Sequence, residues 1–365
     1  MIACLSPNGQ IVLRGSEAPT RLIVATLRGV SVLERAAGDK PWTHRGRTLD
    51  GHHCSSVTLE PERGGVFAGM HSGGLWFSAD GGETWEPRSN GLTKDHVYSI
   101  AYARQREGLV LYACTQPVGL FRSLDYGRSW VELPALARMP GHEEWTFPSP
   151  PHEAHCKGLA FDPRDPQTMY AAIEQGAFMR SSDGGESWRE FEGYAAPDDF
   201  LRHDIHRVVS VPSNPDELFL TTGIGLYYSP NRGESWERLT DSSFRIGYPD
   251  QLIFSPSDDR VLYMCGSLTN PLGWRQTHHA HGIVMKSSDR GRSWEEASNG
   301  LPVSRPNVEA LSLAAYPSGF TLFVGDTDGT VYASDDGAQS WHLIVDGLAP
   351  VSKVGHYRHL QLTAV

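Results

Sequence analysis

Short hydrophobic stretches, three to a group, recur along the whole chain and are separated by clusters of Gly, Asp and Pro. One group lies at residues 97–103, 110–115 and 119–123. Others lie at 157–161, 168–173 and 177–181, and at 207–211, 217–222 and 225–229. Within each stretch Val, Ile, Leu, Tyr and Phe alternate with smaller or polar residues, which predicts β-strands. No segment convincingly shows the 3.6-residue period of a helix, so we predict an all-β chain without helices.

An octamer of the form Ser-x-Asp-x-Gly-x-Ser/Thr-Trp follows these groups. Its copies lie at residues 78–85, 123–130, 181–188, 229–236, 287–294 and 334–341, with Asn231 in place of Asp in the fourth. The Asp and Ser side chains can hydrogen-bond to nearby backbone groups and hold a tight turn. The Gly supplies a positive φ, and the Trp buries a large ring between neighbouring sheets. We expect every copy to be structural.

The spacing of the octamers predicts the architecture. Trp42 ends a degenerate further copy, GDKPW, and the intervals between the seven tryptophans are 43, 45, 58, 48, 58 and 47 residues. This is the length of a four-stranded propeller blade of the WD40-like type. We therefore predict that residues 1–365 form one domain, a seven-bladed β-propeller of four-stranded antiparallel blades.

The two ends of the chain suggest how the ring closes. The Gly-Leu pair that opens the seventh blade at residues 300–301 returns at 347–348, and a strand-like segment at 356–363 follows it. The first blade begins with residues 21–26, which match a second strand. We expect residues 352–365 to supply the innermost strand of the first blade, which removes an open sheet edge. Residues 1–15 then lie outside the repeat as an extra edge strand.

The octamer resembles the Asp-box (BNR) repeat, and the resemblance covers nearly the whole chain. It implies the propeller fold and says little about function, because sialidases, xyloglucanases, sortilin-type receptors and photosystem assembly factors share it. A sialidase would need a Phe/Tyr-Arg-Ile-Pro motif near its start, whereas the nearest string here, residues 244–247, is FRIG. A xyloglucanase-like enzyme would have two propellers with facing aspartates. Photosystem assembly factors generally carry a secretion signal and an arginine-rich face, and this sequence shows neither.

The charge and the cysteine content of the chain indicate which kinds of binding partner and which cellular location to expect. Lys and Arg total 32 against 43 Asp and Glu, a net charge of −11, which argues against nucleic-acid or anionic-membrane binding. No stretch is apolar enough for a membrane helix, and the first residues do not resemble a signal peptide. The five cysteines suggest buried thiols and a cytoplasmic protein. They are Cys4, Cys54, Cys114, Cys156 and Cys265.

Histidines gather at the starts of the predicted innermost strands. In a propeller these positions share one mouth of the central channel, and neutral histidine is the commonest ligand of zinc, copper and iron. The predicted metal ligands are His53, His155, His206 and His359. If the strand register is shifted by one residue, they are replaced by His52, His96, His203 and His356. The alternative is a hydrated channel mouth that binds no metal.

Other ionisable and aromatic residues occur at the same predicted mouth. The candidate catalytic residues are His206, Lys157, Tyr248 and Glu309. The candidate ligand-binding residues are Arg207, Arg245, Trp274 and His279. Trp274 and His279 belong to the long loop 267–282, which we expect to cover the mouth as a partial lid, although its histidines can equally be a solvated surface tract.

These residues lead to two hypotheses from different classes. The first is a propeller that binds a small organic ligand, anionic or coordinated by Zn, Cu or Fe, at a His-rich channel mouth, with metal-dependent catalysis left open. The alternative is a protein-interaction or assembly scaffold. A glycoside hydrolase or sialidase ranks third, because that assignment would rest on the fold-defining repeat alone.

Overall fold

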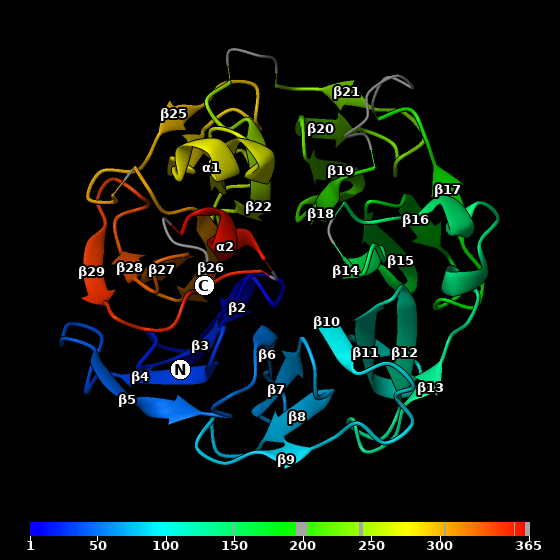
Figure 1. Cartoon of the computed structure of the whole chain (residues 1–365), viewed down its shortest axis with the longest axis horizontal. Helices are drawn as coiled ribbons and strands as arrows, with labels where there is room; N and C mark the ends of the chain where they lie inside the picture. Colours follow the sequence, from blue (N-terminus) through cyan, green and yellow to red (C-terminus); the bar gives the residue numbers. More distant parts are fainter. Residues whose placement is uncertain (149, 195–202, 241–243, 303, 354, 362–365) are drawn as a thin grey trace. The chain divides into compact units, whose positions relative to one another are not determined.

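The computed structural model describes residues 1–148, 150–194, 203–240, 244–302, 304–353 and 355–361. Its strands form seven sheets (Figure 1). The first three are β1 (Ile2–Leu5), β3 (Arg21–Thr26), β4 (Gly29–Glu34), β5 (Thr43–Thr48); β6 (Cys54–Glu60), β7 (Gly65–Met70), β8 (Leu75–Ser78), β9 (Glu86–Pro87); and β10 (His96–Gln105), β11 (Gly108–Gln116), β12 (Gly119–Ser123), β13 (Val131–Glu132). The next two are β14 (His155–Asp162), β15 (Asp165–Glu174), β16 (Phe178–Ser181), β17 (Arg189–Phe191); and β18 (Ile205–Val211), β19 (Asn214–Thr222), β20 (Gly225–Ser229), β21 (Glu237–Arg238). The last two are β22 (Tyr248–Phe254), β23 (Leu262–Ser267), β24 (Gly282–Ser287), β25 (Glu295–Glu296); and β2 (Val12–Arg14), β26 (Val308–Tyr316), β27 (Gly319–Asp326), β28 (Val331–Ser334), β29 (His342–Val345).

The sheets share one plan. From β6 to β29, consecutive strands within a sheet are antiparallel neighbours, and the fourth strand of several sheets has only two residues. The protein is therefore all-β, a seven-bladed β-propeller of four-stranded, mostly antiparallel blades, as the spacing of the tryptophans predicted.

The octamers form the tight turns between the third and fourth strands. In the second octamer the hydroxyl of Ser123 donates to Asp125 Oδ1 at 2.9 Å and accepts the backbone N–H of Gly127 at 2.8 Å. Asp125 Oδ1 also accepts the backbone N–H of Ser129 at 2.8 Å, and φ of Gly127 is +78°. In the other copies the side-chain oxygen at this position likewise accepts the backbone N–H of the residue four positions later. The accepting residues are Asp80, Asp183, Asn231, Asp289 and Asp336. The predicted structural role is confirmed.

The octamer tryptophans differ in burial. Trp130, Trp188 and Trp341 are buried, as predicted. Trp85, Trp236 and Trp294 are half-buried. The indole N–H donates to a backbone or hydroxyl oxygen in five of them, for example from Trp188 Nε1 to the carbonyl of Gly185 at 3.1 Å; the others are Trp85, Trp130, Trp294 and Trp341. A polar tip satisfied in this way lets the large ring pack beside a sheet.

The closure predicted from the C-terminus is wrong. The strand beside β3 is the N-terminal β1, which runs parallel to it with Cys4 opposite Ile23. Residues 1–15 also supply β2, which pairs parallel with β26, so the N-terminal segment does provide edge strands. The tail packs Leu348 and Val351 into a buried cluster with Leu22 and Val24 of β3, its Pro350 carbonyl accepts the Leu27 N–H, and it then forms the helical turn α2 (His356–His359). The apolar, buried β1 occupies the edge that the tail was expected to fill; residues 354 and 362–365 lie outside the described part of the chain.

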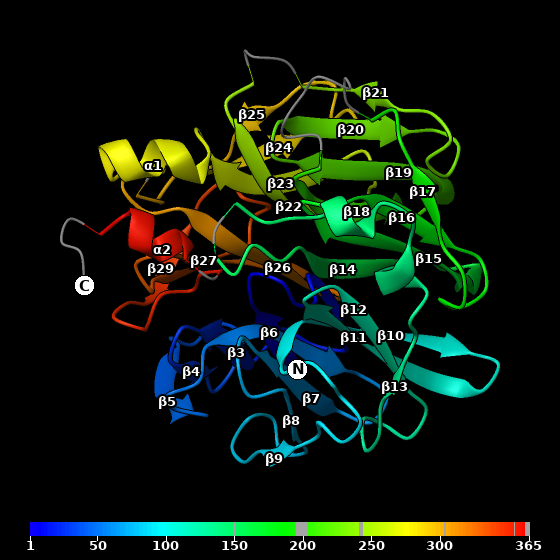
Figure 2. The ribbon, with the colours of Figure 1, turned by 45° about the vertical axis from the view of Figure 1, so that its right-hand side comes forward.

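The expectation of a chain without helices also needs correction. Besides α2, the described residues contain α1 (Pro271–Thr277) and two single 3-10 turns, η1 (Leu136–Arg138) and η2 (His142–Glu144). Asn270 caps α1, because its side chain accepts the N–H groups of Leu272 and Gly273, and Pro271 fits the first helical position. The Asn-Pro pair was the available sequence signal. Figures 1 and 2 show α1 and α2 side by side.

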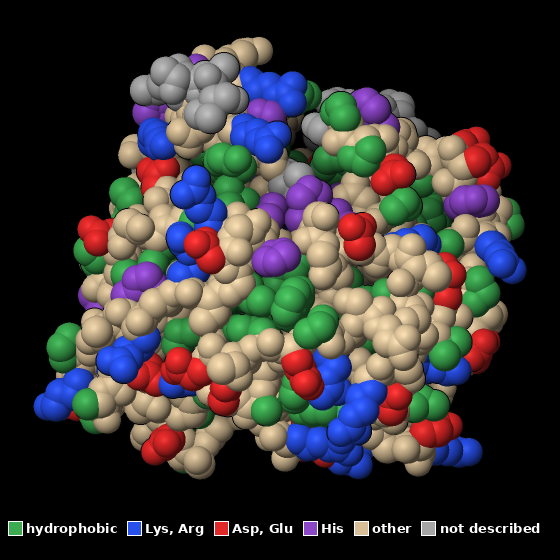
Figure 3. Space-filling view, turned by 60° about the horizontal axis from the view of Figure 1, so that its bottom comes forward, with side chains coloured by type: hydrophobic (Ala, Val, Ile, Leu, Met, Phe, Trp, Pro, Cys, Tyr) green, Lys and Arg blue, Asp and Glu red, His purple; other side chains and the backbone are tan. Residues whose placement is uncertain are grey.

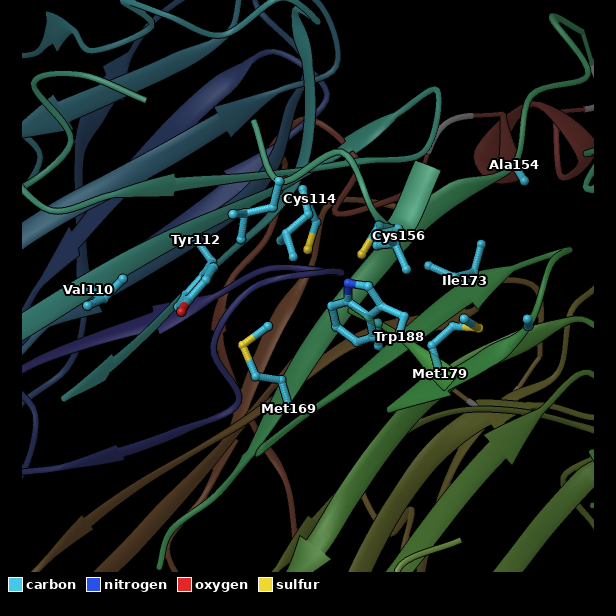
Figure 4. Packing of buried hydrophobic residues seen from close by; sticks show 14 residues of the cluster. Val110, Tyr112, Cys114, Ala154, Cys156, Met169, Ile173, Met179 and Trp188 are labelled. Carbon is cyan, nitrogen blue, oxygen red and sulfur yellow. The ribbon is translucent and has the colours of Figure 1, made fainter. Parts of the chain in front are cut away.

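The chain divides into two compact units. Unit 1 comprises Met1–Ala68, Phe77–Glu86 and Ser242–Val365, and unit 2 comprises Gly69–Trp76 and Pro87–Asp241. In unit 2, Cys114 and Cys156 lie beside Trp188 in a buried cluster with Met169 and Met179 (Figure 4). All five cysteines are free and buried, as predicted. The prediction that residues 1–365 form one domain stays a prediction.

Candidate functional site

Unit 2 contains a buried group of five ionisable side chains, which we call the Glu174 cluster: His155, Lys157, Glu174, Asp204 and His206. Each of these residues is at most 3% exposed. His155 Nε2 lies 2.6 Å from Glu174 Oε2, and Lys157 Nζ lies 3.1 Å from Glu174 Oε1. His206 Nε2 lies 3.3 Å from Asp204 Oδ1 and 3.8 Å from Glu174 Oε1. One carboxylate therefore joins two strands and their cations.

Three of the predicted catalytic residues occupy equivalent places in their blades. The pairing of β14 with β15 shifts register around Lys157, that of β18 with β19 around His206, and that of β26 with β27 around Glu309. A register shift of this kind re-aims the side chain of the extra residue. Tyr98 of β10 occupies the same place. The innermost strand thus presents one ionisable or aromatic residue at a β-bulge in four blades.

The electrostatics of the Glu174 cluster favour an ionised Glu174. Burial acts to raise the pKa of Glu174, but the charge of Lys157 and the charge and hydrogen bond of His155 outweigh it. The pKa of Glu174 therefore lies well below its usual value. A carboxylate held in this way is a poor proton donor at neutral pH, because a general acid needs a raised pKa.

Aromatic rings extend the cluster. The ring of Tyr98 stacks on His155 with a centroid distance of 3.9 Å, and His96 lies 5.2 Å from Tyr98. His96 Nε2 is 2.8 Å from Nδ1 of the half-buried His71. These contacts form a continuous row of rings from His71 to the Glu174 cluster, all within unit 2.

Unit 1 contains a second buried group, which we call the Glu309 cluster: Asp250, Asn307, Glu309, Lys353 and His356. Glu309 Oε1 accepts hydrogen bonds from His356 Nδ1 at 2.9 Å and Asn307 Nδ2 at 3.2 Å. Its Oε2 accepts the backbone N–H of Lys353 at 2.6 Å, and the Lys353 ammonium pairs with Asp250. Burial acts to raise the pKa of Glu309, but His356 and Lys353 lower it below the usual value.

The predicted lid residue Trp274 is a core residue. It is fully buried, its Nε1 donates to the Thr269 carbonyl at 2.7 Å, and its ring meets Tyr248 and His356 edge-on at 6.2 and 5.4 Å. The ring therefore anchors α1 rather than facing a ligand. Tyr248, a predicted catalytic residue, is 5% exposed in the same contact.

The other predicted site residues are dispersed over both units. In unit 1, His53 Nε2 lies 3.2 Å from the Ser352 carbonyl, and Arg245 pairs with Glu296. His359 Nδ1 accepts a hydrogen bond from Arg275 Nε at 3.0 Å, while His279 is exposed and stacks with His281. In unit 2, Arg207 lies in β18. The prediction that these residues meet at one channel mouth concerns both units and stays a prediction.

A metal would find one suitable group of donors among the residues that the structure describes. Ligand atoms of Glu174, Asp204 and His206 all lie within 4.8 Å of one another. Only His206 of the four predicted ligands belongs to this group. Both oxygens of Glu174 already have a partner, because Oε2 contacts His155 and Oε1 lies 3.1 Å from the Lys157 ammonium. A metal bound through Glu174 Oε1 would compete with Lys157 for that oxygen.

Sequence reasoning missed the carboxylates that organise both clusters. Glu174 and Asp204 in unit 2, and Asp250 in unit 1, were not singled out, nor was Lys353. A usable signal was a charged residue at the end of the otherwise apolar, fully buried part of β15. A charge in such a position is rarely buried without a partner.

A family model matches one of the octamer turns. The model described as BNR/Asp-box repeat matches residues 76–87, which contain the first octamer, and the other copies have the same hydrogen bonds. The chain therefore contains the BNR/Asp-box repeat. This match does not specify a protein family beyond the repeat, because the repeat is the structural part of the blade.

Relatives of this Asp-box protein carry two different names. The chain is 23% identical over 253 residues to a xyloglucanase of Paenibacillus sp., covering 58% of this chain and 23% of that protein. It is 25% identical over 268 residues to the photosystem II assembly lipoprotein Ycf48 of a Synechococcus species, covering 68% of this chain and 73% of that protein. The chain therefore spans about a quarter of the length of that xyloglucanase.

Solved structures show the same fold. An ancestral GH74 enzyme matches with a TM-score of 0.62 at 19% identity, covering 80% of this chain and 38% of that one. The structure of YCF48 bound to D1 peptide matches with a TM-score of 0.52 at 15% identity, covering 87% of this chain and 94% of that one.

Two further observations concern the side chains on the surface and the question of a membrane-spanning helix. On the face seen in Figure 3, histidine side chains lie among hydrophobic and basic ones. Where residues are described, no helix is long and apolar enough to cross a bilayer. The cytoplasmic location stays a prediction.

Proposed function

We propose that this Asp-box protein is a binding propeller that holds a protein partner and does not hydrolyse glycosides. The observation that carries the proposal is the state of Glu309, the carboxylate predicted to be catalytic. It is fully buried, and both of its oxygens accept hydrogen bonds from groups of the protein itself. Hydrogen bonds within the protein take three of its roughly four lone-pair sites, and burial keeps the group away from a substrate.

Among the described residues, the three buried carboxylates Glu174, Glu309 and Asp326 do not supply the acid and base that glycoside hydrolysis needs. That reaction uses one carboxyl with a raised pKa and a second that is ionised. Glu174 and Glu309 both have lowered pKa values. Asp326 has a pKa raised to about 6 by burial, but its Oδ1 accepts the N–H groups of Asp328 and Thr330 in the turn after β27. Its role is therefore to shape that turn.

A surface for a protein partner is available on the segment that carries α1. Leu272 is 58% exposed and Leu268 is 40% exposed, although both lie within a segment anchored by the fully buried Trp274. Helix α1 presents the exposed Leu272 near Arg275, and Leu268 lies just before the helix. An exposed apolar side chain beside an arginine, a residue enriched in protein interfaces, suits a small protein interface. The likeness to YCF48, whose structure contains a bound D1 peptide, supports a protein partner as the kind of ligand.

Affinity capture with matched variants tests the proposal. Leu272→Asp removes the exposed apolar side chain and places an acid in the first turn of α1, where it is compatible with the helix. Leu343→Asp changes an equally exposed leucine, 53% exposed, on β29. A protein captured by the natural chain and by Leu343→Asp, and lost with Leu272→Asp, is the expected result. The proposal would be contradicted if the Leu272→Asp variant captured the same protein as the natural chain, or if no protein were captured reproducibly from source cells.

Metal-dependent binding of a small molecule is the second candidate, and the Glu174, Asp204 and His206 donors favour it. Elemental analysis of the purified protein tests it. A stoichiometric metal that is lost in Asp204→Asn and His206→Gln, and retained in His53→Gln, would support this candidate. A protein without bound metal after purification in the presence of zinc would argue against it.

A further inference from the structure

Two neighbouring segments of unit 1 carry positive charge and no carboxylate. Residues 267–282 contain Arg275, His278, His279 and His281 and no Asp or Glu. Residues 351–361 contain Lys353, His356, Arg358 and His359 and likewise no Asp or Glu. In a chain with a net charge of −11, these two segments stand out because their only fixed charges are the cations of Arg275, Lys353 and Arg358.

The fold brings these two segments together. Helix α1 belongs to the first and α2 to the second, and they lie side by side (Figure 2). Arg275 Nε donates to His359 Nδ1 at 3.0 Å, which links the two helices directly. Because Nδ1 accepts this bond, the neutral imidazole carries its proton on Nε2 and remains a donor there.

The described contacts of Arg275 and Arg358 include no carboxylate, whereas Lys353 pairs with Asp250. Both arginines are exposed; Arg275 Nε donates to His359, and Arg358 Nε donates to the Tyr357 hydroxyl at 3.4 Å. The carboxylate that lies near His359, Glu309, is buried and occupied by His356, Asn307 and Lys353. Burial first, and then the charges of Arg275, His356 and Arg358, lower the pKa of His359 to about 4.

We propose that Arg275, Arg358 and His359 form a binding site for a small oxyanion, a phosphate or a carboxylate group, between α1 and α2. Arginine offers several N–H donors in a fixed plane that matches two oxygens of such a group, and the imidazole Nε2–H adds a further donor. Binding an anion here supplies the negative charge that the two segments lack. The inference goes beyond the proposed function, since it stands whether or not a protein partner exists.

Titration of the full chain with inorganic phosphate and with acetate tests the site, with binding measured by NMR or calorimetry. We expect a dissociation constant on the order of 1 mM for the better anion, and a loss of about tenfold with Arg275→Gln or Arg358→Gln. Arg106→Gln, which removes an exposed arginine of the β10–β11 turn, is the control for net charge. Tighter phosphate binding assigns a phosphoryl ligand, and tighter acetate binding assigns a carboxylate.

Three results would overturn the proposal. They are no binding of either anion, equal loss of affinity in Arg106→Gln, and unchanged affinity in both Arg275→Gln and Arg358→Gln. Circular dichroism of each variant confirms that the fold is retained, and a failure here leaves the partner-capture result unaffected because Leu272 is a different residue.

Discussion

Lys157 Nζ lies 3.1 Å from Glu174 Oε1 in the interior of unit 2, and neither side chain is more than 2% exposed. A buried carboxylate loses much of its stabilisation when its cation is removed. We expect Lys157→Met to lower the free energy of unfolding by about 3 kcal/mol, measured by urea denaturation. The double variant Lys157→Met/Glu174→Gln should be less destabilised than the sum of its two single changes. A loss below about 1 kcal/mol for Lys157→Met would show that the pair is not structural.

The octamer aspartates should tolerate an amide but not a methyl group. Asn231 already fills this position in one blade and accepts the Ser235 N–H at 2.9 Å. We therefore expect Asp125→Asn to leave the melting temperature nearly unchanged. Asp125→Ala removes the acceptor for Ser129 and should cost about 1–2 kcal/mol. Equal destabilisation by both changes in a thermal melt would show that the negative charge, rather than the hydrogen bond, holds the turn.

Asp326 should make stability depend on pH in an unusual direction. Burial raises the pKa of this carboxyl to about 6 in the folded protein, whereas its pKa in the unfolded chain is about 4. Between these two pH values the folded protein therefore binds a proton that the unfolded chain does not bind. Its unfavourable contribution is therefore fully present above pH 6 and disappears as the pH falls from 6 towards 4. Asp326→Asn keeps the acceptor oxygen without the charge. It should raise the melting temperature at pH 7.5 and have little effect at pH 4.5; the same gain at both pH values would contradict the assignment.

The more deeply an octamer tryptophan is buried, the more it should contribute to the free energy of unfolding. Trp188 is buried against Met169 and Met179 in unit 2, so Trp188→Ala should lower the free energy of unfolding by about 3–5 kcal/mol. Trp294 is half-buried, and Trp294→Ala should have a smaller effect. Chemical denaturation of both variants checks this order, and the reverse order would contradict it.

The fold was predictable because the octamer contains its own hydrogen-bond partners. Every bond of the turn from Ser123 to Ser129 lies within seven residues, so the sequence alone specifies it. The identity of the first strand was not predictable in this way. β1 and the tail both offered a short apolar segment, and the choice between them depends on packing far along the chain.

The candidate site was predictable only in part, because it too depends on contacts between residues far apart in the sequence. Aligning the strand starts identified Lys157, His206 and Glu309, which the structure places at equivalent β-bulges. Their partners were missed, because Glu174 and Asp204 come from other strands and loops and no sequence spacing joins them. The burial of Trp274 was missed because helix α1 was not foreseen.

We propose that the buried carboxylates in the described part of this propeller are structural ion-pair partners and not reacting groups. Release of reducing ends from xyloglucan, followed from pH 4 to 8 with the purified chain, tests this claim most directly. We predict a rate equal to that of buffer alone at every pH. Release proportional to protein concentration, and abolished in a folded Glu309→Gln variant, would contradict the account and restore Glu309 as a catalytic residue.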